Sequence, residues 1–363
     1  MPRNTTSSLV RILEAVQTRR GIARAAAGGL VLAGTLGVGW TTRAQDATPG
    51  TCPATTPAEN TALVERFWKE VWGPGSDAAI AELVADDEVH HWGIGDDTLT
   101  RAEFANRVQT LLAAFPDLTV QVDQTVAEDD LVASRWTATA THQGPWMGIA
   151  PTGNSVTYTG INIFRIACGQ IAESWGEADH VGLLRQLGEL SGMNLPEERE
   201  ATPAALATGG TPCPPGTTDE NRAVAARWFN EAINPGELDR LGDVVSADLV
   251  SHTTGFPDAV GPEAMAGVFG SLREAFPDLH FTVEPGPAEG DLVVERWTAT
   301  GTSTGPFLGL APTGHQMQWT GINIYRIACG KIAETWTEAD TLGRLRQLGG
   351  LPDMSTPVAT PAA

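Results

Sequence analysis

The chain has 363 residues, of which 42% are hydrophobic and 18% charged, and its formal net charge is −21. That length predicts two or three domains, and the hydrophobic fraction is sufficient for each of them to bury a core. A surface this acidic repels phosphate backbones, so the composition argues against nucleic-acid binding.

The N-terminal segment, residues 1–44, has the composition of an export signal. It holds six arginines and one glutamate, and the stretch 25–42 carries no charge. Residues 18–24 resemble a twin-arginine signal, and residues 42–44 form a small-residue context suited to cleavage. The alternative is an uncleaved membrane anchor, because the uncharged stretch is near the length that spans a bilayer. We therefore expect an exported protein, extracellular or in the cell envelope, and membrane-tethered if the signal stays attached.

A repeat with a constant offset of 161 residues runs through most of the remaining chain. Phe115-Pro116-Asp117 recurs as Phe276-Pro277-Asp278, and Gly160-Ile161-Asn162 recurs as Gly321-Ile322-Asn323. A repeating unit of about 130 residues is too long for a solenoid repeat and has the size of a domain. The sequence therefore predicts two tandem domains, copy 1 (58–190) and copy 2 (219–351).

Three segments lie outside the repeats and are rich in Thr, Pro, Ala and Gly. Such segments bury little apolar surface, which predicts a linker at 45–57, a second linker at 191–218 and a disordered tail at 352–363.

Within copy 1 the hydrophobic pattern predicts helices first. Leu63, Phe67 and Val71 fall on one stripe of a helix that ends at Pro74-Gly75. A second helix is expected over 77–85, with a counterpart over 238–245 in copy 2. A third helix is expected from Thr100 to the Phe-Pro-Asp turn, because the residue before a proline avoids helical geometry.

After the third helix the hydrophobic period changes to two, which predicts strands. Alternation runs from Leu118 through a turn at Glu128-Asp129-Asp130, and two more strands are expected over 155–166 and 170–177. A short helix over 181–187 closes the unit. Helices followed by a largely antiparallel sheet indicate an α+β domain, with a pocket between the two layers.

The four cysteines follow the same offset. Cys52 and Cys168 are 116 residues apart, as are Cys213 and Cys329. Four cysteines allow three pairings. The duplication favours a Cys52–Cys168 and a Cys213–Cys329 disulfide, and the alternative is four free thiols.

Five motifs occur in the same order in both copies: Phe-Pro-Asp, Gly-Pro-Trp/Phe, Pro-Thr-Gly, Trp-x-Glu-x-Asp and Arg-Gln-Leu-Gly. In copy 1 they fall at 115–117, 144–146, 151–153, 175–179 and 185–188. Together they resemble the SnoaL-like family of polyketide cyclases, also called ester cyclases. The resemblance implies two NTF2-like cones, each with three N-terminal helices packed on a curved, mainly antiparallel sheet of four to six strands. It also implies ring closure by intramolecular aldol chemistry on an ester-bearing substrate, without metal or cofactor.

The resemblance assigns a general acid/base to Asp179 and Asp340. A carboxylate in an apolar pocket has a raised pKa and can take a proton from the carbon next to a carbonyl. The alternative role is structural, because each aspartate directly precedes the closing helix, where an N-cap is expected.

Three histidines are further candidates. His91 and His252 are related by the offset, and each is expected to line the pocket or to contact the aspartate, or else to be a packed core histidine. His142 matches a pocket histidine of the family and is Ser303 in copy 2. If His142 donates a hydrogen bond to the substrate oxyanion, copy 2, which has a serine there, is expected to have weaker, altered or no activity. The alternative is that His142 is a turn residue.

The remaining pocket residues are expected at aromatic and asparagine positions of both copies. They are Trp68, Trp146, Tyr158, Asn162, Trp175, Phe229, Phe307, Trp319, Asn323 and Trp336.

These observations favour a lyase or isomerase that cyclises, isomerises or dehydrates a small hydrophobic carbonyl compound. No cofactor or metal is expected, because the sequence contains no phosphate loop, nucleophile elbow or metal-ligand spacing. The alternative is an exported, non-catalytic protein that holds a small molecule in the same pockets. The two copies are expected to form an intramolecular pseudo-dimer, or the chain a homo-oligomer.

Overall fold

The computed structural model describes residues 52–92, 100–190, 214 and 216–351. The expected export signal, the tail, nearly all of the second linker and Cys213 lie outside these residues. Within the described ranges, no helix is long and apolar enough to cross a membrane.

Copy 1 has three helices before its antiparallel strands, each started by a side-chain cap, and its first strand lies between the second and third of them. Thr56 and Thr100 form capping boxes with Glu59 and Glu103, and Ser76 caps the helix between them. Such caps satisfy the backbone N–H groups that a helix start leaves unpaired. The helices of copy 1 are α2 (Pro57–Glu70), α3 (Asp77–Leu83), α4 (Arg101–Ala114) and the closing helix α5 (His180–Gln186). The second helix is two residues shorter than expected, because the first strand begins at Val84.

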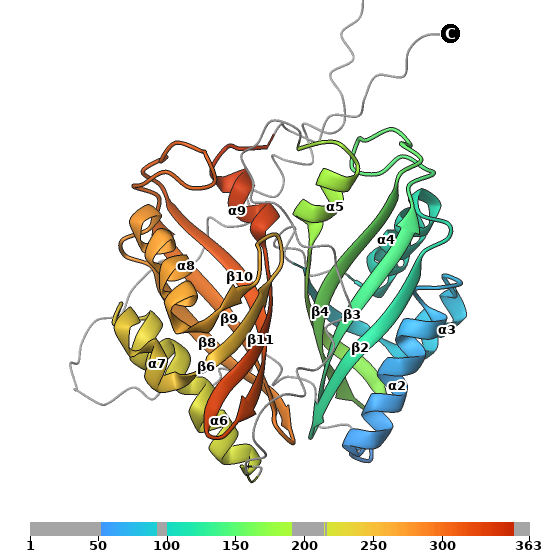
Figure 1. Ribbon diagram of the computed structural model, residues 1–363. Coiled ribbons are helices and arrows are strands. Elements are labelled where there is room, and N and C mark those ends of the chain that lie inside the picture. The colour runs from blue at the N-terminus through green and yellow to red at the C-terminus, as the bar shows by residue number, and fades with distance from the viewer. Residues whose placement is uncertain (1–51, 93–99, 191–213, 215, 352–363) are drawn as a thin grey trace, which may run out of the picture. The chain divides into compact units, whose positions relative to one another are not determined.

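The sheet of copy 1 has the order β1-β5-β4-β3-β2. Its strands are β1 (Val84–Trp92), β2 (Thr119–Glu128), β3 (Leu131–Thr141), β4 (Ser155–Ala167) and β5 (Gln170–Ala178). β1 pairs with β5 in parallel, and the other neighbours are antiparallel. Helices α2, α3 and α4 lie along one face of this curved sheet (Figure 1).

Copy 2 repeats this order. Its helices are α6 (Thr218–Arg227), continued by a π-helical turn at Trp228–Ile233, a 3₁₀ turn at Leu238–Arg240, α7 (Leu241–Val244), α8 (Gly261–Ala275) and α9 (Thr341–Gln347). Its strands are β6 (Val245–Thr253), β7 (Ala259–Val260), β8 (His280–Glu289), β9 (Leu292–Thr302), β10 (Gln316–Ala328) and β11 (Lys331–Ala339). The sheet order is β7-β6-β11-β10-β9-β8. The predicted α+β class and the tandem arrangement are confirmed.

Each copy has a hydrophobic core between its helices and its sheet. In copy 1 the rings of Phe67, Phe104 and Phe164 meet there, with Phe67 5.3 Å from Phe164 and 6.0 Å from Phe104 between ring centroids. In copy 2 Trp228 and Tyr325 pack together in the equivalent layer. Full burial of a large apolar side chain contributes about 1.5–3 kcal/mol, so these aromatic layers dominate the stability of each copy.

The opposite faces of the two sheets contact each other. Ile161 and Ile163 of copy 1 share one hydrophobic cluster with Ile322, Ile324 and Trp336 of copy 2. Reciprocal hydrogen bonds border this cluster, since Thr159 Oγ1 donates to Glu338 Oε1 at 2.6 Å and Thr320 donates to Glu177. The sheet of each copy therefore buries one face under its own helices and the other against its repeat.

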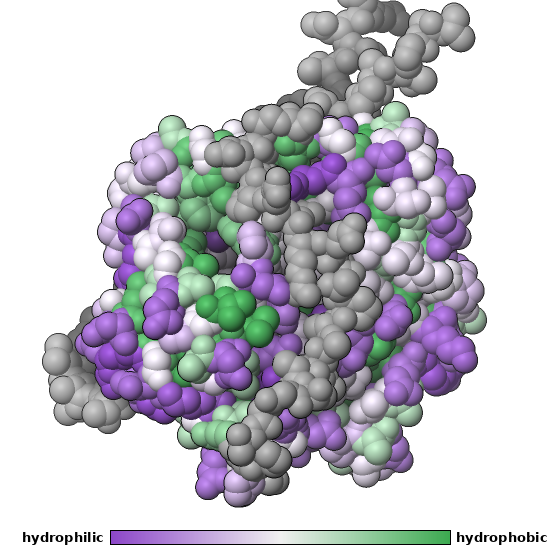
Figure 2. All heavy atoms as spheres, viewed as in Figure 1, coloured by the Kyte–Doolittle hydropathy of each residue, from purple (hydrophilic) through white to green (hydrophobic). Residues whose placement is uncertain are grey.

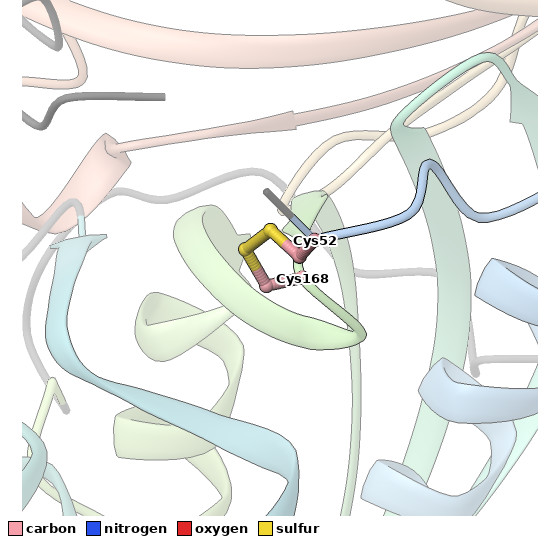
Figure 3. Close-up of a disulfide and its surroundings, with 2 residues drawn as sticks. All are labelled: Cys52 and Cys168. Carbon is pink, nitrogen blue, oxygen red and sulfur yellow. A yellow bond between two sulfur atoms is a disulfide. The ribbon is translucent and has the colours of Figure 1, made fainter. Parts of the chain in front are cut away.

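A disulfide joins Cys52 to Cys168, with their Cα atoms 5.3 Å apart (Figure 3). It ties the segment before α2 to the turn between β4 and β5, where Cys168 adopts a φ of 54°. The first predicted pairing is confirmed. Cys329 is also disulfide-bonded, and its expected partner Cys213 lies outside the described residues.

Candidate functional site

Copy 1 contains a cavity of about 600 Å³ between its helices and the concave face of its sheet. Most of its wall is aromatic or aliphatic: Trp68, Trp72, Leu111, Leu118, Val120, Trp136, Trp146, Met147, Tyr158, Ala178 and Leu183. Its polar wall consists of Glu103, Asn106, Arg107, Thr110 and His180. An apolar chamber of this size with a few polar groups has the character of a small-molecule site.

Trp136 on β3 is fixed by two neighbours in the sheet. Its indole N–H donates to Asn162 Oδ1 at 2.7 Å, and its ring meets Tyr158 edge to face at 5.7 Å. Gly160 lies beneath the ring, where an added Cβ would sit 2.2 Å from Cζ2 of Trp136. The glycine therefore lets the indole lie flat on the sheet and form part of the cavity wall.

His180 and Arg107 bring polarity into this chamber. Burial and, to a smaller extent, the nearby charge of Arg107 lower the pKa of His180 to about 3, against the opposing effect of a hydrogen bond to the Ala178 backbone. His180 is therefore a neutral imidazole near pH 7, and a neutral imidazole has one ring nitrogen that can accept a hydrogen bond. Burial also raises the pKa of Tyr158, which keeps its hydroxyl protonated.

Asp179 lies between two residues that line the cavity, Ala178 and His180, but is not itself among the lining residues. Its Oδ1 accepts the backbone N–H of Gly182 at 2.7 Å and caps α5. The structure thus contains the capping interaction, and the acid/base role stays a prediction.

Asp340 caps α9 in the same way, through Gly343 N–H at 2.7 Å. Burial raises its pKa to about 6, against the opposing effects of the Gly343 N–H and of Arg344 and Arg346. A carboxyl group in this range can both take up and release a proton near neutral pH.

His91 and His252 lie on the sheet face opposite the cavities. His91 stacks on Trp175 with ring centroids 5.5 Å apart and pairs with Glu173 at 3.0 Å. His252 stacks on Trp336 and lies 3.0 Å from an oxygen of Asp258 and 3.1 Å from one of Glu334. Burial lowers the pKa of His252, but these carboxylates outweigh it and the net shift is upward. Neither histidine lines its cavity.

The residue before each of these histidines faces inward instead. His90 is buried, its Nδ1 lies 2.5 Å from Ser174 Oγ, and its ring packs on Phe104. The equivalent Ser251 lines the cavity of copy 2. Adjacent strand residues point to opposite faces, so His90 and Ser251, rather than His91 and His252, face the helices of their copies.

His142 closes a turn rather than lining the cavity. It is fully buried, and its Nδ1 accepts the backbone N–H of Thr152 at 3.2 Å. Ser303 accepts the equivalent N–H of Thr313 at the same 3.2 Å in copy 2. Burial lowers the pKa of His142. The exchange of histidine for serine therefore preserves one backbone contact, and the prediction of an oxyanion donor gains no support from the position of His142.

The other predicted pocket residues divide into three groups. Trp68, Trp146 and Tyr158 line the cavity of copy 1, and Phe229, Phe307, Trp319 and Asn323 line that of copy 2. Asn162 lies behind the wall as the acceptor for Trp136. Trp175 and Trp336 were expected in the pockets but lie on the opposite sheet face, where Trp336 packs under the Arg135 guanidinium of copy 1 at 5.4 Å.

Copy 2 has a cavity of about 490 Å³ with a different polar set. At the offset of 161, Val268 replaces Arg107, Thr341 replaces His180 and Trp319 replaces Tyr158, while Arg344 replaces Leu183. Figure 2 shows apolar residues around a hollow beside α8, the helix that carries several of the lining residues. His180, Arg107 and Arg344 were missed from the sequence, and a search for polar residues that break the repeat would have found all three.

No group of three or more histidine, cysteine or acidic side chains placed to hold a metal ion occurs among the described residues.

Comparison with known proteins adds a family. The family model for SnoaL-like polyketide cyclases matches twice, at residues 62–187 and 223–348. Aklanonic acid methyl ester cyclase AcmA from Streptomyces galilaeus is 30% identical over 128 residues, 35% of this chain and 89% of that protein. Two solved structures are similar. AclR from Streptomyces galilaeus has 33% identity and a TM-score of 0.35 over 38% of this chain and 90% of its own. IdmH from Streptomyces antibioticus has 34% identity and a TM-score of 0.33 over 36% of this chain and 98% of its own.

Proposed function

Because the chain belongs to the SnoaL-like polyketide cyclase family, we propose that copy 1 catalyses cofactor-free acid/base chemistry on a small hydrophobic carbonyl compound. The reaction class is an intramolecular aldol cyclisation, or an isomerisation or dehydration through the same enolate. The similarity to AcmA, a methyl ester cyclase, over a stretch of about one copy's length supports the proposal that the substrate carries an ester.

The observation that carries the proposal is the polar set of the copy 1 cavity. A cation, Arg107, and a neutral imidazole, His180, occur in a wall that is mainly aromatic or aliphatic. A fixed positive charge beside apolar surface stabilises developing negative charge more strongly than it would in bulk water.

The proposed sequence of steps uses these two groups together with Asp179, which the family resemblance assigns as the acid/base and which lies between the cavity-lining residues Ala178 and His180. Asp179 takes a proton from the carbon next to the substrate carbonyl, and the enolate oxygen receives the positive charge of Arg107. The enolate carbon then bonds to a second carbonyl carbon of the same molecule. The alkoxide formed takes the proton back from the Asp179 carboxyl, so the base is regenerated. His180 accepts a hydrogen bond from a substrate hydroxyl and orients it.

Copy 2 supports a second role in the same chain. Its cavity has Val268 and Thr341 where copy 1 has Arg107 and His180. The copy 2 cavity therefore has no counterpart of Arg107 or His180 at the equivalent positions, which favours ligand binding over turnover in copy 2.

We extend the proposal to the assembly and to the location of the protein. The shared cluster of Ile161, Ile322 and their neighbours supports an intramolecular pseudo-dimer. The Cys52–Cys168 disulfide supports export to an oxidising compartment, directed by the twin-arginine-like segment at residues 1–44.

The experiment is native mass spectrometry of the full chain purified from its own host, with extraction of bound small molecules. Wild type is compared with Asp179→Asn and Asp340→Asn, since asparagine preserves an N-cap and removes the carboxylate. An enolisable carbonyl compound that accumulates only in Asp179→Asn supports turnover in copy 1. If all three forms hold the same ligand equally, the proposed enzymatic function is contradicted and the protein is a small-molecule-binding protein.

A further inference from the structure

Arg344 is a buried cation in the wall of the copy 2 cavity. It is 5% exposed and projects from α9, at the position that Leu183 occupies in copy 1. Burial lowers its pKa to about 10, and the charge of Asp340 opposes that shift. The guanidinium is therefore still charged at neutral pH.

The donors of this guanidinium are largely unused. A guanidinium carries five N–H donors, and Nη2 of Arg344 donates to Thr341 Oγ1 at 3.3 Å. Its Nε is buried and has no acceptor among the described residues. The carboxylate of Asp340 acts on the guanidinium through its charge. A buried cation with most of its donors unsatisfied is costly, which indicates that a further partner is supplied from outside the chain.

Aromatic rings hold the guanidinium in place. Its Cζ lies 4.7 Å from the ring centroid of Phe307 and 5.4 Å from that of Trp319. Both rings line the same cavity. The cation–π contacts fix the plane of the group without using its N–H donors, which stay available to an acceptor in the cavity.

We propose that the copy 2 cavity is a binding site for the carboxylate of an apolar, flat organic acid, with Arg344 as its charged ligand. A planar guanidinium presents paired N–H groups that match the two oxygens of a carboxylate. Trp297, Trp319 and Phe281 supply an apolar wall for the rest of the ligand. This site goes beyond the proposed reaction of copy 1 and does not depend on it.

The charge of the cavity favours a monoanion over a phosphate. Among the described residues that line the cavity, Arg344 is the one cation and Glu274, at the exposed rim, is the one acid. Asp340, which is not among the lining residues, acts on Arg344 through its charge. A phosphate dianion needs more than one cation or a cluster of backbone donors. One guanidinium in an apolar wall balances a single negative charge.

The test compares anthracene-2-carboxylate with its methyl ester by isothermal titration calorimetry at pH 7.5. The full chain carries Arg107→Leu throughout, which removes the cation that lines the copy 1 cavity. In this background the acid should bind more tightly than the ester. Arg344→Leu, which installs the residue found in copy 1, should weaken acid binding about tenfold or more and leave ester binding within about twofold.

Two further variants keep the result interpretable. Arg240→Leu removes an exposed arginine that lines neither cavity and should leave acid binding unchanged. Arg344→Lys keeps the charge, loses the paired donors, and should fall between wild type and Arg344→Leu. Equal weakening of acid and ester in Arg344→Leu, or no preference for the acid with Arg344 present, overturns the proposal. The preference for the acid over the ester is measured with Arg344 in place, so this test is valid even if Arg344→Leu does not fold.

Discussion

Trp136 donates its indole N–H to Asn162 Oδ1 at 2.7 Å, and Trp297 donates to Asn323 Oδ1 at 2.9 Å in the second copy. Both tryptophans line their cavities while both asparagines are buried in the sheet. The duplication has therefore preserved one polar contact within each apolar wall, although the residues around it differ. This contact couples the stability of each sheet to the shape of its cavity.

Replacing Asn162 with alanine should lower the free energy of unfolding by about 1–3 kcal/mol, because the buried Trp136 N–H loses its acceptor. Chemical denaturation followed by tryptophan fluorescence measures the change. Asn230, an exposed asparagine of copy 2, provides the control, and Asn230→Ala should change the free energy by less than about 0.5 kcal/mol. Equal effects of the two substitutions would show that the Trp136–Asn162 contact contributes little.

The sequence predicted the fold well because the repeat and the local signals agree. The 161-residue offset located both copies, and α3 and α4 begin within one residue of their predicted starts, directly after the caps Ser76 and Thr100. The helix expected over 238–245 is instead a 3₁₀ turn followed by the single turn of α7. Short helices depend on tertiary packing, which local propensity does not report.

The candidate site was predicted less well, for two physical reasons. His91 and Trp175 pair across β1 and β5 and share a face, but the face that meets the helices cannot be read from alternation when both faces of a sheet are buried. His180 and Arg344 lie on the short closing helices α5 and α9. Whether their side chains reach the cavities depends on how those helices pack on the sheets. Residues that break the repeat, such as Arg344 in place of Leu183, are the remaining sequence signal.

Removing the Cys52–Cys168 disulfide should destabilise copy 1 strongly. The bond closes a loop with a sequence separation of 116 residues, which corresponds to about 4–5 kcal/mol in the chain-entropy description. The double variant Cys52→Ser/Cys168→Ser should therefore unfold at a lower denaturant concentration than wild type. A reducing agent should shift wild type in the same direction. Identical midpoints for oxidised wild type and the double variant would contradict a stabilising role.

The buried glutamates between the copies should make stability fall as pH rises. Burial and the nearby Asp340 raise the pKa of Glu177 to about 8, against the Thr320 hydroxyl and Arg296. Burial raises the pKa of Glu338 to about 7, against hydrogen bonds from Thr159 and Thr254. The folded chain thus holds protons that the unfolded chain releases above its ordinary glutamate pKa, and the stabilisation is lost progressively between about pH 4.5 and 8.

Urea denaturation at a series of pH values measures this loss. Glu177→Gln/Glu338→Gln keeps the hydrogen-bonding shape and removes the titration, so its stability should vary less over the same interval. Glu65→Gln, an exposed glutamate on α2, is the matched control. A pH slope that is the same in wild type and in the double variant would contradict the assignment.

His180 should stay neutral across the physiological range, and Arg107 should contribute to that state. Arg107→Leu should raise the pKa of His180, because a positive neighbour no longer opposes its protonation, while burial still holds it below the ordinary value. Nitrogen NMR of histidine-labelled protein follows the ring directly. An unchanged His180 titration in Arg107→Leu would show that the charge of Arg107 does not affect the pKa of His180.

The most direct test of the proposed chemistry is proton abstraction itself. The rate at which 2-tetralone, an enolisable ketone, exchanges its α-protons in deuterated water can be followed by proton NMR with saturating ligand. We predict that wild type and Asp340→Asn accelerate the exchange, that Asp179→Asn loses at least about 100-fold of the acceleration, and that Arg107→Leu is also impaired. If wild type and Asp179→Asn both bind the ketone but exchange its α-protons at the same rate, general-base catalysis in copy 1 is contradicted.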